Sequence, residues 1–283
     1  MKPRRPPLPW INYLGNKDFF SLISNTGGGY SFYKDAKLRR VTRYRYNNVP
    51  ADNGSRCYYL SLMDSDSADA KPVETWSPTF LPCKTPLDSY KCRQGIGYTV
   101  FEASKRGIES KLTAFVPLHT NAEINRLDVT NTTDEPAVID VTGSVEWCLW
   151  NAVDDSSNFQ RNLSTGEVEI ERETDATLLY HKTEFKERRN HYAFYGVNAP
   201  VVASTPAATS SSASSTAGTP RRSSPKARRT IPWRTAGSRS QPTACVWNSS
   251  RAKPHRSCSC WAISKWPRTR NGRIRTIRPR SAS

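Results

Sequence analysis

The stretch Ala137–Cys148, AVIDVTGSVEWC, decides the fold class of this chain. Its apolar and polar residues alternate, with Ile139, Val141, Val145 and Trp147 on one face and Asp140, Thr142, Ser144 and Glu146 on the other. Successive side chains of an extended strand point to opposite faces, so a period of two predicts a strand with one buried and one wet face. Such half-buried strands are typical of antiparallel sheets.

The same alternation recurs on both sides of this stretch. Apolar residues alternate in Leu112–Val116, Leu127–Val129 and Glu167–Glu171, and Tyr192–Val197 is a further run of aromatic and β-branched residues. Turn-forming segments separate the runs: Asn25–Gly29, Asp52–Gly54, Thr132–Pro136 and Ser164–Gly166. Many short strands joined by turns predict an all-β fold, a large antiparallel β-sandwich, with no amphipathic helix.

The charge of the 283-residue chain is distributed unevenly. Its formal net charge is +17, and residues 201–283 hold 17 of the 42 Lys and Arg residues but none of the 25 Asp and Glu residues. We call residues 201–283 the basic tail. Since the basic tail lacks a helix or strand period, we predict that it is disordered and follows an incomplete sandwich domain at 9–200, itself preceded by an irregular segment at 1–8.

Composition also excludes several classes of protein. No run approaches the roughly 20 apolar residues that cross a bilayer, and Met1–Trp10 is basic and Pro-rich, without the apolar centre of a signal peptide. We therefore expect a cytoplasmic protein with no membrane partner. The seven cysteines show no zinc-ligand spacing, and even Cys258 and Cys260 have only Cys245 and His255 nearby, so we expect free thiols and no metal.

Three motifs have an ordinary structural explanation. Asp154 and Asp155 are neighbours, whose side chains point to opposite sides of an extended chain, so we expect solvated loop acids and no catalytic pair. His181 and His191 lie ten residues apart and are expected to be ordinary hydrogen-bonded or exposed histidines. Gly27–Gly29 is followed by neither Lys-Ser/Thr nor a helix, which favours a tight turn over a phosphate loop.

The loop Asn151–Thr165, NAVDDSSNFQRNLST, is the candidate site. Together with Trp150 it combines aromatic rings with planar amide and guanidinium groups between two predicted strands. A ring gives a sugar a surface to stack on, and the planar groups can hydrogen-bond to its hydroxyls, although a polar surface loop would look similar. We expect the following residues to lie next to a sugar substrate: Phe159, Gln160, Arg161 and Asn162.

Three long segments carry a family resemblance: PWINYLGNKDFFSLISNTGGGYSFYKDAKLRRVTRYRYNN (Pro9–Asn48), SVEWCLWNAVDDSSNFQRNLSTGEVEIE (Ser144–Glu171) and YHKTEFKERRNHYAFYGVNAP (Tyr180–Pro200). They resemble the N-terminal region of the cellobiose phosphorylases of glycoside hydrolase family 94, formerly glycosyltransferase family 36. The resemblance covers residues 9–200, and Met1–Pro7 departs from it.

The resemblance implies a β-sandwich that is followed, in the family, by linker helices and an (α/α)6 barrel with the catalytic aspartate. The family reaction is inverting phosphorolysis of cellobiose to glucose 1-phosphate and glucose, with inorganic phosphate as co-substrate and no cofactor. Family members are homodimers, and the resemblance places Gln160 and Arg161 near the active site of the neighbouring subunit. We therefore expect a truncated domain for cellobiose or a related β-glucoside, without the barrel, without catalytic residues of its own and inactive alone.

The basic tail has a second reading, which starts one base earlier in each codon. With suitable codons Ala262–Ile277 becomes GYFEMAEDQEWENPDN, and Ala236–Lys253 becomes GWQPVAAHSMRLELEPGK, an alternating strand followed by a turn. Ala203–Arg222 permits GFDT, an apolar run and NGWDTPQ. Because this reading restores the missing acidic residues, our hypothesis is a reading-frame shift near Val201 or Val202.

Two other functions stay open from the sequence. The loop around Phe159 could belong to a freestanding carbohydrate-binding module. The Arg-rich stretch Arg268–Arg280 would neutralise nucleic-acid phosphates with a strong dependence on salt. Since any basic peptide would do this, we expect no specific nucleic-acid partner.

Overall fold

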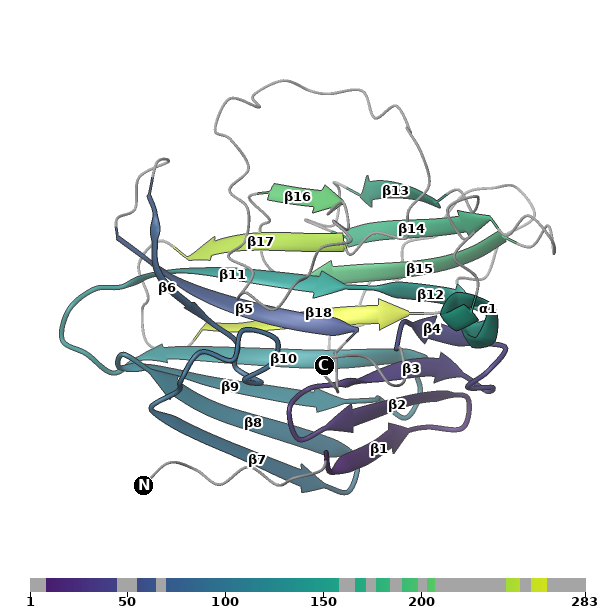
Figure 1. The fold of residues 1–283 in the computed structure, drawn as a ribbon, viewed down its shortest axis with the longest axis horizontal. Helices are drawn as coiled ribbons and strands as arrows, with labels where there is room; N and C mark the ends of the chain where they lie inside the picture. Colours follow the sequence, from purple (N-terminus) through teal and green to yellow (C-terminus); the bar gives the residue numbers. More distant parts are fainter. Residues whose placement is uncertain are drawn as a thin grey trace, which may run out of the picture.

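A computed structural model describes residues 9–44, 55–64, 70–157, 166–171, 177–183, 190–197, 203–206, 243–249 and 256–263. Within these ranges the chain is built almost wholly of strands, which form three antiparallel sheets (Figure 1). The predicted all-β class is therefore confirmed.

The first sheet, called the N-terminal sheet, has five strands. Their order is β1 (Ile11–Gly15), β2 (Phe19–Ser24), β3 (Gly29–Tyr33), β4 (Arg40–Thr42) and β12 (Trp147–Trp150). The predicted glycine turn joins β2 to β3, and a positive φ of 82° at Gly27 and 124° at Gly29 explains why glycine occupies both places. A side chain at Gly29 would also collide with the backbone carbonyl of Leu22.

The second sheet has eight strands and is called the eight-stranded sheet. Their order is β13 (Gly166–Glu171), β14 (Thr177–Thr183), β15 (Asn190–Val197), β18 (Arg256–Ile263), β10 (Ala122–Asn131), β9 (Ile108–Phe115), β8 (Tyr98–Lys105) and β7 (Ser89–Gly95). Strand β18 pairs with β10 on one side and with β15 on the other, so it joins the two halves of this sheet.

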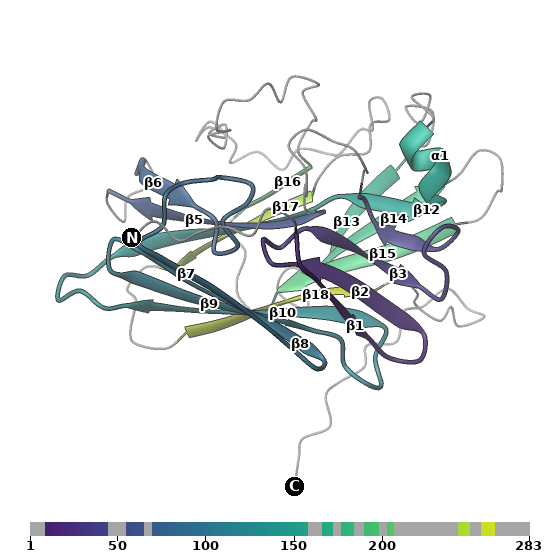
Figure 2. The ribbon, with the colours of Figure 1, turned by 60° about the horizontal axis from the view of Figure 1, so that its bottom comes forward.

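The third sheet is called the β11 sheet. Its order is β16 (Ala203–Pro206), β17 (Thr243–Ser249), β11 (Val138–Val145), β5 (Arg56–Met63) and β6 (Pro72–Trp76). In Figure 2 strands β7 to β10 lie below β5 and β6, with strands β1 to β3 of the N-terminal sheet beside them. One core cluster lies between the sheets and draws on all three, for example through Phe19, Phe101 and Val141.

The alternating stretch Ala137–Cys148 is divided between two sheets. Ile139, Val141 and Val145 are buried on β11 as the alternation predicts. At Glu146 the chain leaves this sheet, because the Glu146 backbone bonds to both Ser55 and Arg43, and Trp147 is buried on β12 of the N-terminal sheet. The single predicted strand is therefore two strands, which carry the chain from one sheet to another.

Two further expectations need correction. The loop after Trp150 begins with a six-residue helix, α1 (Ala152–Ser157), where no helix was predicted. Parts of the basic tail form strands β16, β17 and β18, where disorder was predicted. Strands β10, β11 and β15 each offer an edge to these segments, and backbone hydrogen bonding places few demands on side chains. The boundary at Pro200 stays a prediction.

Candidate functional site

The sugar-contact residues expected from the sequence, Phe159, Gln160, Arg161 and Asn162, lie outside the described residues. The structure does describe the base from which they extend, since α1 ends at Ser157. Trp150, also expected to offer its ring, is buried at 9% exposure in β12 and cannot serve as an open stacking surface. The described part of the candidate site is therefore its base, helix α1.

Helix α1 begins at a local cap. The Asn151 side-chain oxygen accepts hydrogen bonds from the backbone N–H of Val153 (3.0 Å) and Asp154 (3.2 Å). Asparagine is a favoured capping residue because it satisfies N–H groups that have no partner within the first turn. The N–H of Ala152 donates to the carbonyl of Lys37 at 2.7 Å, which attaches the helix start to the β3–β4 connection.

A buried ion pair between Arg43 and Asp155 fixes the same helix. Arg43 Nε lies 2.9 Å from Asp155 Oδ2 and Nη2 lies 2.9 Å from Oδ1, a two-point contact between planar groups. Their side chains are only 5% and 3% exposed. Glu146 is a second acid near this guanidinium, 3.6 Å from Nη1.

Asp155 is therefore a structural anchor. The expectation of two solvated loop acids is wrong for this residue, because the helix turns its carboxylate inward toward Arg43. The anchor links α1 to the chain just after β4, so the residues that follow Ser157 extend from a fixed position. Arg43 and Asp155 lie 112 positions apart in the sequence, so no local sequence pattern predicts their pairing.

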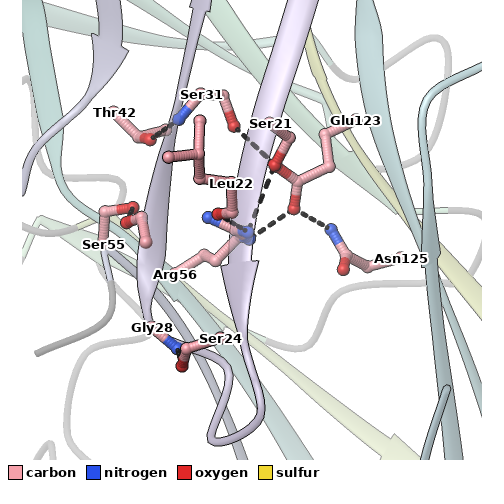
Figure 3. Close-up of polar contacts among 11 residues, drawn as sticks. Ser21, Leu22, Ser24, Gly28, Ser31, Thr42, Ser55, Arg56, Glu123 and Asn125 are labelled. Carbon is pink, nitrogen blue, oxygen red and sulfur yellow. Dashed lines mark hydrogen bonds and ion pairs between the residues drawn. The ribbon is translucent and has the colours of Figure 1, made fainter. Parts of the chain in front are cut away.

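A second buried polar cluster, centred on Glu123, was missed from the sequence (Figure 3). Glu123 on β10 is 1% exposed and forms an ion pair with Arg56 Nε on β5. Its Oε2 accepts hydrogen bonds from the hydroxyls of Ser21 on β2 and Ser31 on β3, both at 2.6 Å, and its Oε1 accepts one from Asn125 Nδ2 at 2.8 Å.

The Glu123 cluster connects all three sheets. Arg56 Nη2 extends it to the carbonyl of Leu22, 3.1 Å away. Three of its buried atoms, Arg56 Nε, Arg56 Nη1 and Asn125 Oδ1, have no hydrogen bond, although Nε forms the ion pair with Glu123. With the carboxylate saturated and shielded from solvent, the cluster is suited to hold the sheets in register and has no route to a substrate. The sequence feature that could have revealed this cluster is the pair of polar residues Glu123 and Asn125 within a run that otherwise reads as a strand.

Other candidate groups carry no chemistry in the described part of the chain. Cys83 and Cys92 are free thiols, as expected. Burial raises the pKa of Cys57 to about 12 and those of Cys83 and Cys92 to about 11, so these thiols are protonated at neutral pH.

Neither a metal cluster nor a membrane-spanning helix is found in the described part of the chain. Among the described residues no group of three or more His, Cys, Asp and Glu could hold a metal ion. His181 and His191 lie on the neighbouring strands β14 and β15, and their side chains fall outside the described part. No helix in that part is long and apolar enough to span a bilayer.

The architecture places the chain in the class of large antiparallel β-sandwich domains. The family model of the glycosyl hydrolase 94 supersandwich domain matches residues 1–216, and the chain belongs to this family. The family resemblance seen in the sequence is confirmed.

Several curated relatives are phosphorylases of disaccharides. N,N'-diacetylchitobiose phosphorylase of Vibrio furnissii is 33% identical over 180 residues, 63% of this chain and 22% of the relative. The protein of the same name from Vibrio proteolyticus is 36% identical over 159 residues, 56% of this chain and 19% of the relative. The 3-O-beta-D-glucopyranosyl-beta-D-glucuronide phosphorylase of Paenibacillus borealis is 31% identical over 132 residues, 47% of this chain and 15% of the relative. The chain thus spans about a fifth of the length of the first two.

Among solved structures, a putative aldose 1-epimerase from Escherichia coli overlaps with a TM-score of 0.47 and 7% identity, over 92% of this chain and 100% of that one. This likeness is too distant to inform function.

Proposed function

We propose that this chain is the N-terminal supersandwich part of a phosphorylase of a β-linked disaccharide, and that it is inactive alone. Family membership over residues 1–216 carries the proposal. The substrate class is cellobiose or a related β-glycoside, which includes the N,N'-diacetylchitobiose named for two relatives. Inorganic phosphate is the co-substrate and no cofactor is required.

The reaction proposed for the whole enzyme is inverting phosphorolysis. A phosphate oxygen forms a bond to the anomeric carbon while the glycosidic C–O bond breaks, and a general acid protonates the departing oxygen. Since phosphate itself is the nucleophile, one carboxylic acid suffices, whereas an inverting hydrolase needs an acid and a base. We assign that acid to the catalytic barrel of the family.

Within this proposal the supersandwich supplies sugar contacts to a neighbouring subunit of a cytoplasmic homodimer. Gln160 and Arg161 would provide amide and guanidinium donors, flanked by Phe159 and Asn162. Support comes from the base of the loop, where Asn151 caps α1 and the Arg43–Asp155 pair fixes it. A rigid base limits the entropy lost when the loop engages a sugar.

Two measurements on the purified chain test the proposal. Incubation with cellobiose or N,N'-diacetylchitobiose and phosphate should release no sugar 1-phosphate above a protein-free control, and release would contradict it. Calorimetry with the same sugars should show no saturable binding, since the site is completed by a barrel. Saturable binding that is lost in Arg161→Ala would instead favour a freestanding carbohydrate-binding module.

A further inference from the structure

Strand β1 lies at the edge of the N-terminal sheet and, among the described strands, pairs with β2 alone (Figure 1). The carbonyl of Trp10 accepts a hydrogen bond from the N–H of Asn25 at 2.8 Å. Past the other end of β1, the N–H of Asn16 donates to the carbonyl of Phe19 at 3.0 Å. Bonds to one neighbour recur at every second residue of an antiparallel strand, so the backbone groups of the odd-numbered residues of β1 point to the open side.

The open side of β1 lacks the features that protect other sheet edges. Exposed edges usually carry charged residues, proline or a bulge, which prevent pairing with another chain. Strand β7, at the edge of the eight-stranded sheet, carries Lys91 and Arg93, and β6, at the edge of the β11 sheet, carries Pro72 and Glu74. The sequence of β1, INYLG, contains neither a charged residue nor proline. Its edge is therefore able to pair with a further strand.

Large apolar side chains are exposed around this edge. Tyr13 is 73% exposed, Trp10 is 67% exposed, and Ile11 and Tyr98 are also exposed. Tyr98 belongs to the start of β8, which lies next to β1 because Asn12 Nδ2 donates to the Tyr98 carbonyl at 3.0 Å. A strand that covered this edge would remove apolar area from water and satisfy open backbone groups at the same time.

The charges of the edge strands favour a second copy of this chain as the partner. Strand β1 can pair antiparallel with the same strand of a second copy about a two-fold axis at Tyr13, so that Ile11 faces Gly15. No like charges meet in this pairing, since β1 has none. Self-pairing of β7 about its middle residue would instead place Lys91 opposite Arg93, and like charges directly opposite each other are destabilising.

The side chains around Gly15 also fit this register. Gly15 pairs with Phe20, whose ring occupies the space where a Cβ of Gly15 would lie. The same ring stacks on Phe32, with 5.2 Å between the centroids. Ile11 of the second copy would therefore face a residue without a side chain, beside a fixed aromatic ring. Across the two-fold axis the two copies of Tyr13 would form an aromatic cross-strand pair, which stabilises a sheet.

We propose that β1 is a dimer interface, in which its open edge pairs antiparallel with β1 of a second copy of this chain. The same strand is used by both copies, so the assembly closes at two subunits and the N-terminal sheet continues across the two-fold axis. The inference goes beyond the proposed function, which names no dimer surface, and it rests on the edge of β1 alone.

The first test is sedimentation equilibrium of the purified full chain over a range of concentrations, which should show a monomer–dimer equilibrium. Tyr13→Lys places two like charges across the two-fold axis and should raise the dimer dissociation constant at least about tenfold. Val73→Lys, at an exposed position of β6, is the matched control and should leave the constant unchanged. A wild-type chain that stays monomeric, or a dimer that survives Tyr13→Lys, would overturn the interface and leave phosphorolysis to its own activity measurement.

A charge swap tests the register of the pairing. Tyr13→Glu should also weaken self-association, because two carboxylates would then meet at the axis. An equimolar mixture of Tyr13→Lys and Tyr13→Glu chains should associate at least about tenfold more tightly than either variant alone, since opposite charges then face each other. A folding defect in either variant cannot produce this recovery. A mixture that is as monomeric as its components would overturn the pairing about Tyr13 and with it the proposal.

Discussion

Residues 9–157 and residues 166–263 join the same sandwich in different ways. In the first region, buried charged groups from distant strands pair with each other, as in the Glu123 cluster and the Arg43–Asp155 anchor. In the second region, Ala193 and Tyr195 of β15 belong to the core cluster, and backbone ladders place strands β16 to β18 beside β10, β11 and β15. Side-chain pairs demand particular residues, whereas ladders accept many sequences. Substitutions of the paired buried charges should therefore have the largest effects, and the following predictions run from these pairs to smaller effects.

The largest effect is expected at Glu123. Glu123→Gln removes the charge that compensates Arg56 and leaves a buried guanidinium unpaired, which costs about 3–5 kcal/mol. The free energy of unfolding from urea titration measures the loss. Glu102→Gln is the matched control, because its pair with Arg93 is largely solvent-exposed, and such pairs contribute about 0–1 kcal/mol. Equal losses in the two variants would contradict the role given to the Glu123 cluster.

The second-largest loss in the free energy of unfolding is expected for Asp155→Ala. It removes a charge-assisted, two-point contact to Arg43, for which a loss of about 2–3 kcal/mol is expected. Glu146 still lies near the guanidinium and limits the damage. Hydrogen exchange should speed up in residues 152–157 first, because α1 loses its anchor. Unchanged exchange in α1 would show that the ion pair does not hold the base of the loop.

A close approach between two sheets gives a third prediction. A Cβ at Gly143 of β11 would lie 2.2 Å from the hydroxyl oxygen of Tyr195 on β15. Gly143→Ala should therefore cost about 1–3 kcal/mol through overpacking. Added to Tyr195→Phe, the same change should cost less, since the next ring atom is 3.2 Å away. An equal cost in both backgrounds would show that the hydroxyl is not the obstacle.

The effect that is smallest at neutral pH concerns the thiols. Because burial raises the pKa of Cys57 above its unfolded value of 9.0, folding favours the protonated thiol. This contribution is complete below pH 9 and is lost as pH rises from 9 toward 12. The free energy of unfolding should fall over that range, and less so in Cys57→Ala. At pH 8 iodoacetamide should modify Cys57, Cys83 and Cys92 more slowly in the folded chain than in urea, because burial raises their pKa values.

The alternation along β11 shows what the sequence could and could not predict. It correctly gave the buried faces of Ile139, Val141 and Val145, because period-two patterning is local. It did not predict that Trp147 belongs to another sheet, since the departure at Glu146 depends on Ser55 and Arg43 far away in sequence. Glu123 was missed and Asp155 was read as solvated for the same reason, because Ser31, a partner of Glu123, and Arg43, the partner of Asp155, lie 92 and 112 positions away along the chain.

The basic tail shows that strands can form where the sequence has no strand pattern. Its lack of pattern predicted no strands, yet β17 and β18 occupy strand positions, because an open edge can recruit a backbone without regard to its side chains. In register with the buried residues of β11, β17 places Cys245 and Trp247 opposite Gly143 and Val141 but Ser249 opposite Ile139. The shift of frame near Val201 stays a prediction.

Sequencing codons 195–210 from independently prepared DNA is the most direct test of the account. We predict a one-base difference that changes the frame near Val201 or Val202, so that the restored product regains acidic residues and reads HSMRLEL across positions 243–249. An unchanged, verified frame that runs through Ser283 would contradict it, because the basic tail would then be a genuine part of this protein.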